Sequence, residues 1–452
     1  MLFKRRCFVF PFFCLLICSC FFIPRLISAQ QNNETSAPDE KVSGEKISGE
    51  KMPGTDEKVS GEKMSGEKMP GEKVSGEKVS GEEISDEKIQ EDTETELKRL
   101  LEETDLYEWQ KYFDELPALT GKTPEYENIE RMIESIALSP GEMKQDRIIG
   151  NFKALLFPSF TRSVKRLTGV IAAALLTGFC AIASGDGKQE LKNTLMLFIC
   201  AVSVLALTAV FSDIAAETTD AIKRTERFSA AAEPVLMGLL TALGCRNSVK
   251  FLSPAFVFLS GNIIAFIKNA VMPLLLAAGV LTVTNGLTNR LKLGNLVKLL
   301  QKTVKWMLGL AAAVYIAFTA VGGISAGTAD GISIRTAKYA VDRLVPAVGG
   351  MVTGAVDAAI SGALLLKNAA GIVSIILLTA ITLKPLIELL GTMLALRLTA
   401  AVIQPFADER ITKMIEGTAE NVNLLFASLA AVTSMFVITA VIIISTGSML
   451  VG

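Results

Sequence analysis

Hydrophobic and polar positions are segregated along this chain rather than interleaved. Charged residues crowd positions 33–150, whereas apolar residues crowd positions 167–447. An apolar run of about 20 residues is long enough to cross a bilayer as an α-helix. The carboxyl-terminal part is therefore expected to be a membrane bundle, and the amino-terminal part a polar region attached to it.

The apolar runs divide the carboxyl-terminal part into candidate membrane spans. The longer runs are 167–184, 193–212, 250–268, 270–288, 306–325, 345–366, 369–390 and 423–447. Two shorter runs, 234–245 and 391–404, fit tilted spans or re-entrant segments. The sequence thus predicts an all-α, polytopic helical bundle of about 8–10 spans over residues 161–452.

Small side chains recur every four residues in the span 345–366, at Gly350, Gly354, Ala358 and Gly362. On a helix this spacing makes one narrow ridge that another helix backbone can approach closely. Asp357 lies beside the ridge. Because a carboxylate is costly inside a bilayer, we expect it to face protein or water rather than lipid.

The amino-terminal 92 residues carry two recognisable segments. A basic start, an apolar run from Cys7 to Ile23 and the small residues Ser28 and Ala29 predict a secretory signal peptide over 1–29; an uncleaved first membrane helix is the alternative. Residues 30–92 are dominated by a degenerate pentapeptide repeat, most often Gly-Glu-Lys-Val-Ser. One apolar residue in each repeat cannot build a core, so we expect a disordered linker.

Two apolar stripes predict short helices in the exported region 93–160. The first consists of Leu106, Trp109, Phe113 and Leu116, preceded by a capping signal at Thr104-Asp105. The second consists of Ile129, Ile133 and Ile136. Such short helices make a small core, and we expect them to pack on each other, on the membrane domain or on a partner.

Composition narrows the possible chemistry. The chain has no histidine, which removes histidine-based catalysis and histidine-ligated zinc, and its net charge of −1 predicts no nucleic-acid partner. No cysteine lies between residues 30 and 166, so no disulfide framework is expected in the exported region. Walker A, zinc-protease and nucleophile-elbow motifs are absent from the sequence. We therefore predict no enzymatic activity, no cofactor and no metal.

Polar residues within the spans remain as functional candidates: Asp357, Lys384 and Arg397. They could line a conduit or bind a substrate. Alternatively, Asp357 is paired inside the bundle, while the two cations extend to a membrane interface or, for Lys384, pair with Glu388.

Three ordered runs resemble the stage III sporulation protein AE family of endospore-forming bacteria. They are 329–340, which contains Arg335 and Lys338; 364–371, which contains Lys367 and Asn368; and 403–411, which contains Gln404 and Pro405. The layout of signal peptide, short exported region and multi-pass domain is also similar, so that the resemblance covers roughly residues 100–450. The repeats depart from the family pattern.

The resemblance implies a non-enzymatic component of a channel complex that links mother cell and forespore. It implies assembly with the other proteins of the stage III sporulation A operon and with a forespore membrane partner. The location implied is the mother-cell-derived outer forespore membrane, and the role is support of late forespore gene expression and spore formation. The alternatives left by the sequence are a permease for a small molecule and, with less support, an intramembrane enzyme.

Overall fold

The computed structural model consists of α-helices and short π-helical turns throughout the part of the chain that it describes. That part comprises residues 86–115, 117, 126–138, 158, 160–169, 171–172, 175–176, 189–286, 293–344, 349–405 and 408–446. Within it, the structure describes only the backbone of residues 86–90, 189–193, 195–196, 255, 258–260, 320–344 and 349–356. The expected signal peptide and most of the repeat linker lie outside the described residues.

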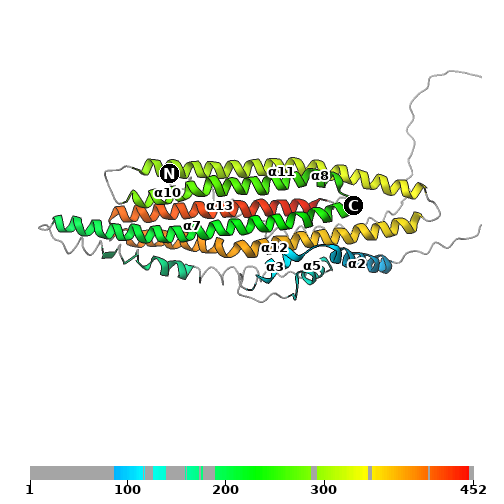
Figure 1. The fold of residues 1–452 in the computed structure, drawn as a ribbon, viewed down its shortest axis with the longest axis horizontal. Coiled ribbons are helices and arrows are strands. Elements are labelled where there is room, and N and C mark those ends of the chain that lie inside the picture. Colours follow the sequence, from blue (N-terminus) through cyan, green and yellow to red (C-terminus); the bar gives the residue numbers. More distant parts are fainter. Residues whose placement is uncertain are drawn as a thin grey trace, which may run out of the picture.

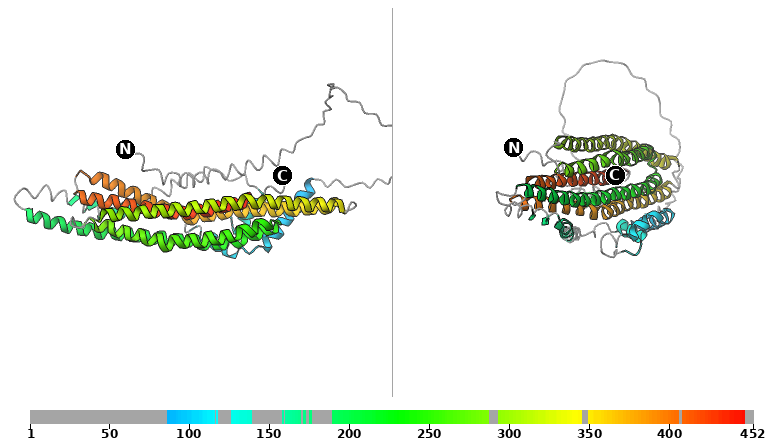
Figure 2. Two further views of the ribbon diagram at one scale, coloured as in Figure 1. Left: turned by 90° about the horizontal axis from the view of Figure 1, so that it is seen from above. Right: turned by 60° about the vertical axis from the view of Figure 1, so that its left-hand side comes forward.

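Four long helices dominate the fold: α7 (Gln189–Ala242), α11 (Gly294–Leu344), α12 (Gly349–Ile403) and α13 (Glu409–Ser445). Between α7 and α11 the chain follows one nearly continuous helical course: α8 (Arg246–Val257), η2 (Phe258–Ile263), α9 (Ile264–Phe266), η3 (Ile267–Val271) and α10 (Met272–Thr284). Figures 1 and 2 show these helices side by side along one common axis. The predicted all-α membrane bundle is confirmed.

The helices end where local chemistry stops them. Gly244 has φ 76°, a left-handed conformation that favours glycine. The amide of Cys245 donates to the carbonyl of Leu240 at 3.1 Å and that of Gly244 to Thr241 at 2.9 Å, which together form a Schellman ending of α7. At the start of α13, the Asp408 side chain accepts a hydrogen bond from the Arg410 amide at 2.7 Å.

The division into separate spans differs from the sequence expectation. Apart from residues 243–245, the runs 193–212 and 234–245 belong to one helix, α7. Apart from 345–348 and Gln404, the runs 345–366, 369–390 and 391–404 fall on one helix, α12. Among the described residues, four helices are long and apolar enough to cross a membrane: Leu197–Ala242, Gly261–Thr284, Asp357–Ile403 and Glu409–Ser445. Charged residues interrupt an apolar run without ending a helix, because lysine, glutamate and arginine are good helix formers.

Helix α13 is the central element of the bundle. From Asn421 to Ile444 none of its residues is exposed. Its first half joins a core with α7, α10, α11 and the carboxyl-terminal half of α12, through residues such as Leu425, Leu207, Leu275 and Leu396. Its second half joins another core with the carboxyl-terminal part of α7 and the first half of α12.

Three short helices cover one outer side of the bundle: α2 (Asp86–Glu103), α3 (Tyr107–Asp114) and α5 (Ile129–Leu138). The structure confirms the burial of the predicted stripes at Leu106, Trp109, Phe113, Ile129, Ile133 and Ile136. Helix α2 begins at Asp86, before residue 93 where the helical region was expected.

The stripe of α3 inserts into the bundle rather than forming a separate core. Trp109 is fully buried, its ring lies 6.1 Å from that of Phe228 on α7, and its Nε1 donates to the Ala231 carbonyl at 3.4 Å. Phe228 in turn lies 5.6 Å from Phe436 of α13. An aromatic chain thus joins α3, through α7, to the central helix α13.

The backbone of α2 passes directly over Gly362 of α12. A Cβ atom at this position would lie 3.0 Å from the Thr93 carbonyl oxygen and 3.2 Å from the Leu97 nitrogen. Ala358, one turn earlier, is buried, whereas Gly350 and Gly354 lie where α12 is described by its backbone alone. The close neighbour at Gly362 is therefore the polar helix α2 rather than another long helix of the bundle.

Substituting Gly362→Leu is expected to displace α2 from α12, because backbone atoms of α2 cannot yield as a flexible side chain would. Limited proteolysis of the full chain in membranes should then cut within α2 faster than in the wild type. Gly238→Leu is the matched control, because Gly238 lies in a helix with no heavy atom within 4 Å of its Cβ position. Equal cleavage of the two variants would contradict the close packing of α2.

Candidate functional site: the polar middle of helix α7 and the buried ion pairs

The predicted polar candidates on α12 do not converge on one site. From the helical rise, Asp357 and Lys384 are about 40 Å apart along the axis, and Lys384 and Arg397 about 20 Å. Asp357 and Lys384 are half-buried. Arg397 is exposed, and its Nη2 lies 3.9 Å from Glu420 Oε2 of α13. The three positions therefore belong to different parts of the bundle.

A larger group of charges, eight residues, lies instead in the middle of α7, over residues 212–233. Charge-free segments precede and follow it within the same helix. At 1.5 Å per residue this polar segment is about 33 Å long, close to the thickness of a bilayer's hydrocarbon core. Its charges point in two directions, some toward neighbouring helices and some away from the bundle.

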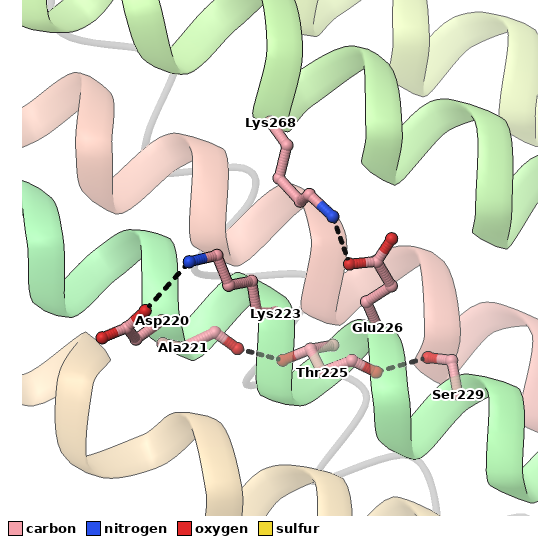
Figure 3. A network of polar contacts seen from close by, with 7 residues as sticks. All are labelled: Asp220, Ala221, Lys223, Thr225, Glu226, Ser229 and Lys268. Atoms are coloured by element: carbon pink, nitrogen blue, oxygen red, sulfur yellow. Dashed lines mark hydrogen bonds and ion pairs between the residues drawn. The ribbon is translucent and has the colours of Figure 1, made fainter.

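Glu226 is one of the inward charges, and it meets Lys268 of η3. Figure 3 shows the Lys268 Nζ directed at the Glu226 carboxylate, 2.6 Å away. The Glu226 and Lys268 side chains retain 30% and 24% of their exposure, so the pair is only partly shielded from solvent. Lys268 lies in a π-helical turn, a local widening that often accompanies function in helical proteins.

Glu217 is the second inward charge, and it lies against Glu388 of α12. Glu388 is buried, and its carboxylate accepts a hydrogen bond from Arg162, which precedes the first predicted span. Arg166 and Lys384 are close enough to act on Glu217 electrostatically. Two carboxylates and three cations from three segments thus compensate one another, as buried charges require.

A neighbouring hydrogen bond joins two of these three segments. The Ser163 and Thr392 hydroxyl groups are 2.9 Å apart, and Thr392 donates to the carbonyl of Glu388 at 2.8 Å. The segment around Arg162 is therefore held on α12 by both ionic and neutral contacts.

A third polar network links α11, α13, α12 and α10. Lys305 Nζ lies 2.5 Å from Glu420, which also faces Arg397. One turn away, Gln301 donates to Asn421 at 2.9 Å, and Asn421 donates to Thr282 at 2.8 Å. These contacts join four helices at one level.

Lys367 on α12 donates hydrogen bonds to carbonyl groups at the carboxyl end of α13. Its side chain is fully buried, and its Nζ donates to the carbonyl of Ile444 at 2.8 Å and to that of Thr446. The last carbonyls of a helix lack intrahelical partners and carry the negative end of the helix dipole. One turn later, Gly371 leaves room for the Ile444 side chain. Lys367 therefore caps the central helix from outside it.

The other residues of the three sequence runs have different surroundings. Asn368 is half-buried, and its Oδ1 is buried without a hydrogen-bond partner in the described structure. Gln404 and Pro405 form an exposed turn after α12. Arg335 and Lys338 lie on α11, in a stretch described by its backbone alone.

Sequence reasoning missed several residues of these networks: Arg162, Glu217, Glu226, Lys268 and Glu420. All except Glu226, which lies inside the charged segment 212–233, are charged residues within or near an apolar run, which is the signal that marks intramembrane sites. Their partners were not visible in the sequence, because Arg162 and Glu388, for example, are 226 positions apart. No group of three or more histidine, cysteine, aspartate or glutamate side chains suited to a metal ion occurs among the described residues.

These features define the protein as a helical membrane protein whose charges are paired across helix contacts. The model of the stage III sporulation protein AE family matches residues 127–447, and the chain belongs to that family. It is 31% identical over 279 residues to "Stage III sporulation protein AE" of Bacillus subtilis (strain 168), covering 61% of this chain and 70% of that protein. No solved structure matches the chain.

Replacing Lys367→Met is expected to destabilise the bundle by about 1–3 kcal/mol, because two buried carbonyl groups at the end of α13 lose their donor. Thermal unfolding of the purified full chain in detergent should show a lower Tm. Lys302→Met, at an exposed position of α11, is the control and should have a smaller effect. An equal decrease in both variants would contradict the capping role.

Reversing one charge of the Glu226–Lys268 pair should destabilise the bundle by about 1–3 kcal/mol, between the values typical of exposed and buried pairs. The double reversal Glu226→Lys with Lys268→Glu should recover much of the loss, as measured by Tm in a double-mutant cycle. The same cycle at Asp220 and Lys223, whose side chains are 66% and 46% exposed, should give a coupling energy near zero. Additive effects at Glu226 and Lys268 would show that the pair is not energetically coupled.

Proposed function

We propose that this protein is a non-enzymatic integral membrane component of a channel complex between mother cell and forespore, needed for late forespore gene expression and spore formation. Its partners are the other proteins of the stage III sporulation A operon and a protein of the forespore membrane. It resides in the mother-cell-derived outer forespore membrane.

The observation that carries the proposal is where the charges of the bundle lie. Three ion pairs each join different helices at packed contacts: Lys305–Glu420, Glu226–Lys268 and Arg162–Glu388. Such pairs hold helices in one arrangement, which suits a component around which an assembly is built. The exported helices α2, α3 and α5 dock on the bundle through Trp109 and leave their outer faces available to a partner.

A second candidate function is transport of a small molecule by this chain alone. It is favoured by the π-helical turns η2 and η3, which interrupt the course from α8 to α10 and place Lys268 against Glu226. Interrupted helices with polar groups at membrane depth are common in secondary transporters. The ion pair occupies both charges in this arrangement, which favours the structural role.

The testing experiment is a late forespore-specific reporter in sporulating cells that lack the gene, scored after engulfment is complete. We expect a silent reporter and shrunken forespores, both restored by the wild-type gene. Normal reporter activity and normal forespore size would overturn the proposed role.

Asp357→Asn separates the two candidate functions in the same cells, with the amount of protein in membranes checked by immunoblot. A proton-coupled permease should lose its activity, because the carboxylate would be its proton carrier. A structural component should keep the reporter active at normal protein amounts.

A further inference from the structure

Large apolar side chains are exposed in two groups on two sides of the bundle. Patch A lies near the amino end of α7 and the carboxyl end of α12 and consists of Leu197, Phe198, Leu205, Leu398 and Val402. Patch B lies on α10 and α11 and consists of Leu276, Val280, Leu310, Val314 and Phe318. Figure 1 shows α7 and α12 on one side of α13, and α10 and α11 on the other. The one charged residue between positions 389 and 403 of α12 is Arg397, whose Nη2 lies 3.9 Å from Glu420 of α13.

The two patches lie at different levels along the bundle axis. Phe228 of α7 lies 5.6 Å from Phe436 of α13, measured between ring centroids. The residue before Phe436 accepts a hydrogen bond from the Tyr315 hydroxyl of α11, so Phe228 and Tyr315 share one level. Leu205 precedes Phe228 by 23 positions, which is about 35 Å at the helical rise, whereas the residue before Tyr315 already belongs to patch B. A hydrocarbon core is about 30 Å thick, so a bilayer perpendicular to the bundle axis cannot enclose both patches.

At the level of patch B, the opposite side of the bundle is polar. Arg227 directly precedes Phe228 and is exposed. Helix α3 covers α7 at the same level, with the Trp109 ring 6.1 Å from that of Phe228. An exposed charge in hydrocarbon is costly and faces protein or water instead. Lipid can therefore cover α11 at this level, but it does not cover α7.

At the level of patch A, charge and apolar surface have exchanged sides. Lys413 of α13 precedes Phe436 by 23 positions, just as Leu205 precedes the aromatic partner of Phe436 on α7. The two helices run in the same direction, since Cys200 of α7 is close enough to Asp408 for an electrostatic interaction. Lys413 and Leu205 are both exposed. At this level lipid can therefore cover α7, while the start of α13 is suited to water.

Helix α11 passes from charged to apolar side chains along one exposed line. The line consists of Lys298, Lys302, Trp306, Leu310 and Val314, which recur every four residues and are all exposed. Lysine and tryptophan are typical of the headgroup region of a bilayer, whereas leucine and valine are typical of its hydrocarbon core. The edge of a bilayer on α11 is therefore expected near Trp306.

We propose that patches A and B both contact the hydrocarbon core of one bilayer, and that the bundle axis is therefore strongly inclined to the membrane normal. One aqueous side then contains α2, α3, α5 and the exposed charges of α7, and the other contains the starts of α11 and α13. An inclined helix needs more residues to cross a bilayer than an upright one, which agrees with the 54, 51 and 55 residues of α7, α11 and α12. The inference deepens the proposed role as an integral membrane component and rests on it.

The test is a measurement of membrane depth on the full chain, with the seven native cysteines replaced by alanine. Single cysteines are introduced in two pairs: Leu205→Cys with Lys413→Cys at the level of patch A, and Val314→Cys with Arg227→Cys at the level of patch B. All four positions are exposed, so folding should be little affected. Each cysteine receives a nitroxide spin label in detergent, and the protein is reconstituted into phospholipid vesicles. Collisions of the label with oxygen report hydrocarbon, and collisions with a water-soluble nickel chelate on both sides of the vesicle report water.

We expect oxygen to dominate at positions 205 and 314 and the nickel chelate to dominate at positions 227 and 413. The order of lipid and water then inverts between the two levels, which an upright bundle cannot produce. Water contact at either position 205 or position 314 would leave only one patch in the bilayer and overturn the proposal. A label at any of the four positions that meets neither reagent would show a protein contact and also overturn it.

The sporulation reporter separates a failure of this inference from a failure of the proposed function. A chain that restores the reporter but lacks the expected depth pattern would overturn the inclination alone. The expected depth pattern, together with a normal reporter in cells that lack the gene, would overturn the sporulation role and leave the inclination in place.

Discussion

The bundle depends on one electrostatic constraint: a charge or an unpaired carbonyl enclosed by apolar helices needs a partner. Helix α13 is enclosed along most of its length, and Ile443 and Thr446 at its carboxyl end are buried. Lys367 supplies the missing donor from α12, and its own charge is placed where the helix dipole is most negative. A single lysine thereby supplies hydrogen bonds to the last carbonyl groups of the central helix and fixes the register of that helix against α12. The capping lysine and the small Gly371 beside Ile444 act together, because close approach brings the Nζ within reach of the carbonyls.

The lengths of the helices set a second constraint. Helices α7, α11 and α12 contain 54, 51 and 55 residues, so each is about 76–83 Å long, far more than a hydrocarbon core of about 30 Å. A large part of the bundle must therefore lie outside the bilayer. The docked helices α2, α3 and α5 cover one such part, near the carboxyl end of α13. The stretch of α12 from Asp357 to Met393 has no exposed residue, because protein rather than lipid surrounds it.

The sequence was sufficient for the helical class, for membrane residence and for the buried stripes at Trp109 and Ile133. These features follow from local periodicity and run length, which tertiary contacts seldom overturn. The span boundaries could not be predicted from hydropathy, because Lys367 interrupts an apolar run while its side chain finds acceptors on α13. Nor could the pairs be predicted, since Lys367 and Ile444 are separated by 77 positions and Arg162 and Glu388 by 226. Periodicity in the sequence predicts which side of one helix is apolar, whereas the pairing of charged residues on different helices depends on how the helices pack.

The distribution of the charges distinguishes their roles along α7. Glu217 and Glu226 point inward, where cations of other segments compensate them, and changing either would disturb a helix contact. Arg224 and Arg227 are exposed on the outer side of α7. A helix needs only one polar side to bind its neighbours in a bundle, and a second polar side reduces its compatibility with lipid. The outward charges of α7 are therefore better explained by what surrounds the bundle than by the stability of the bundle itself.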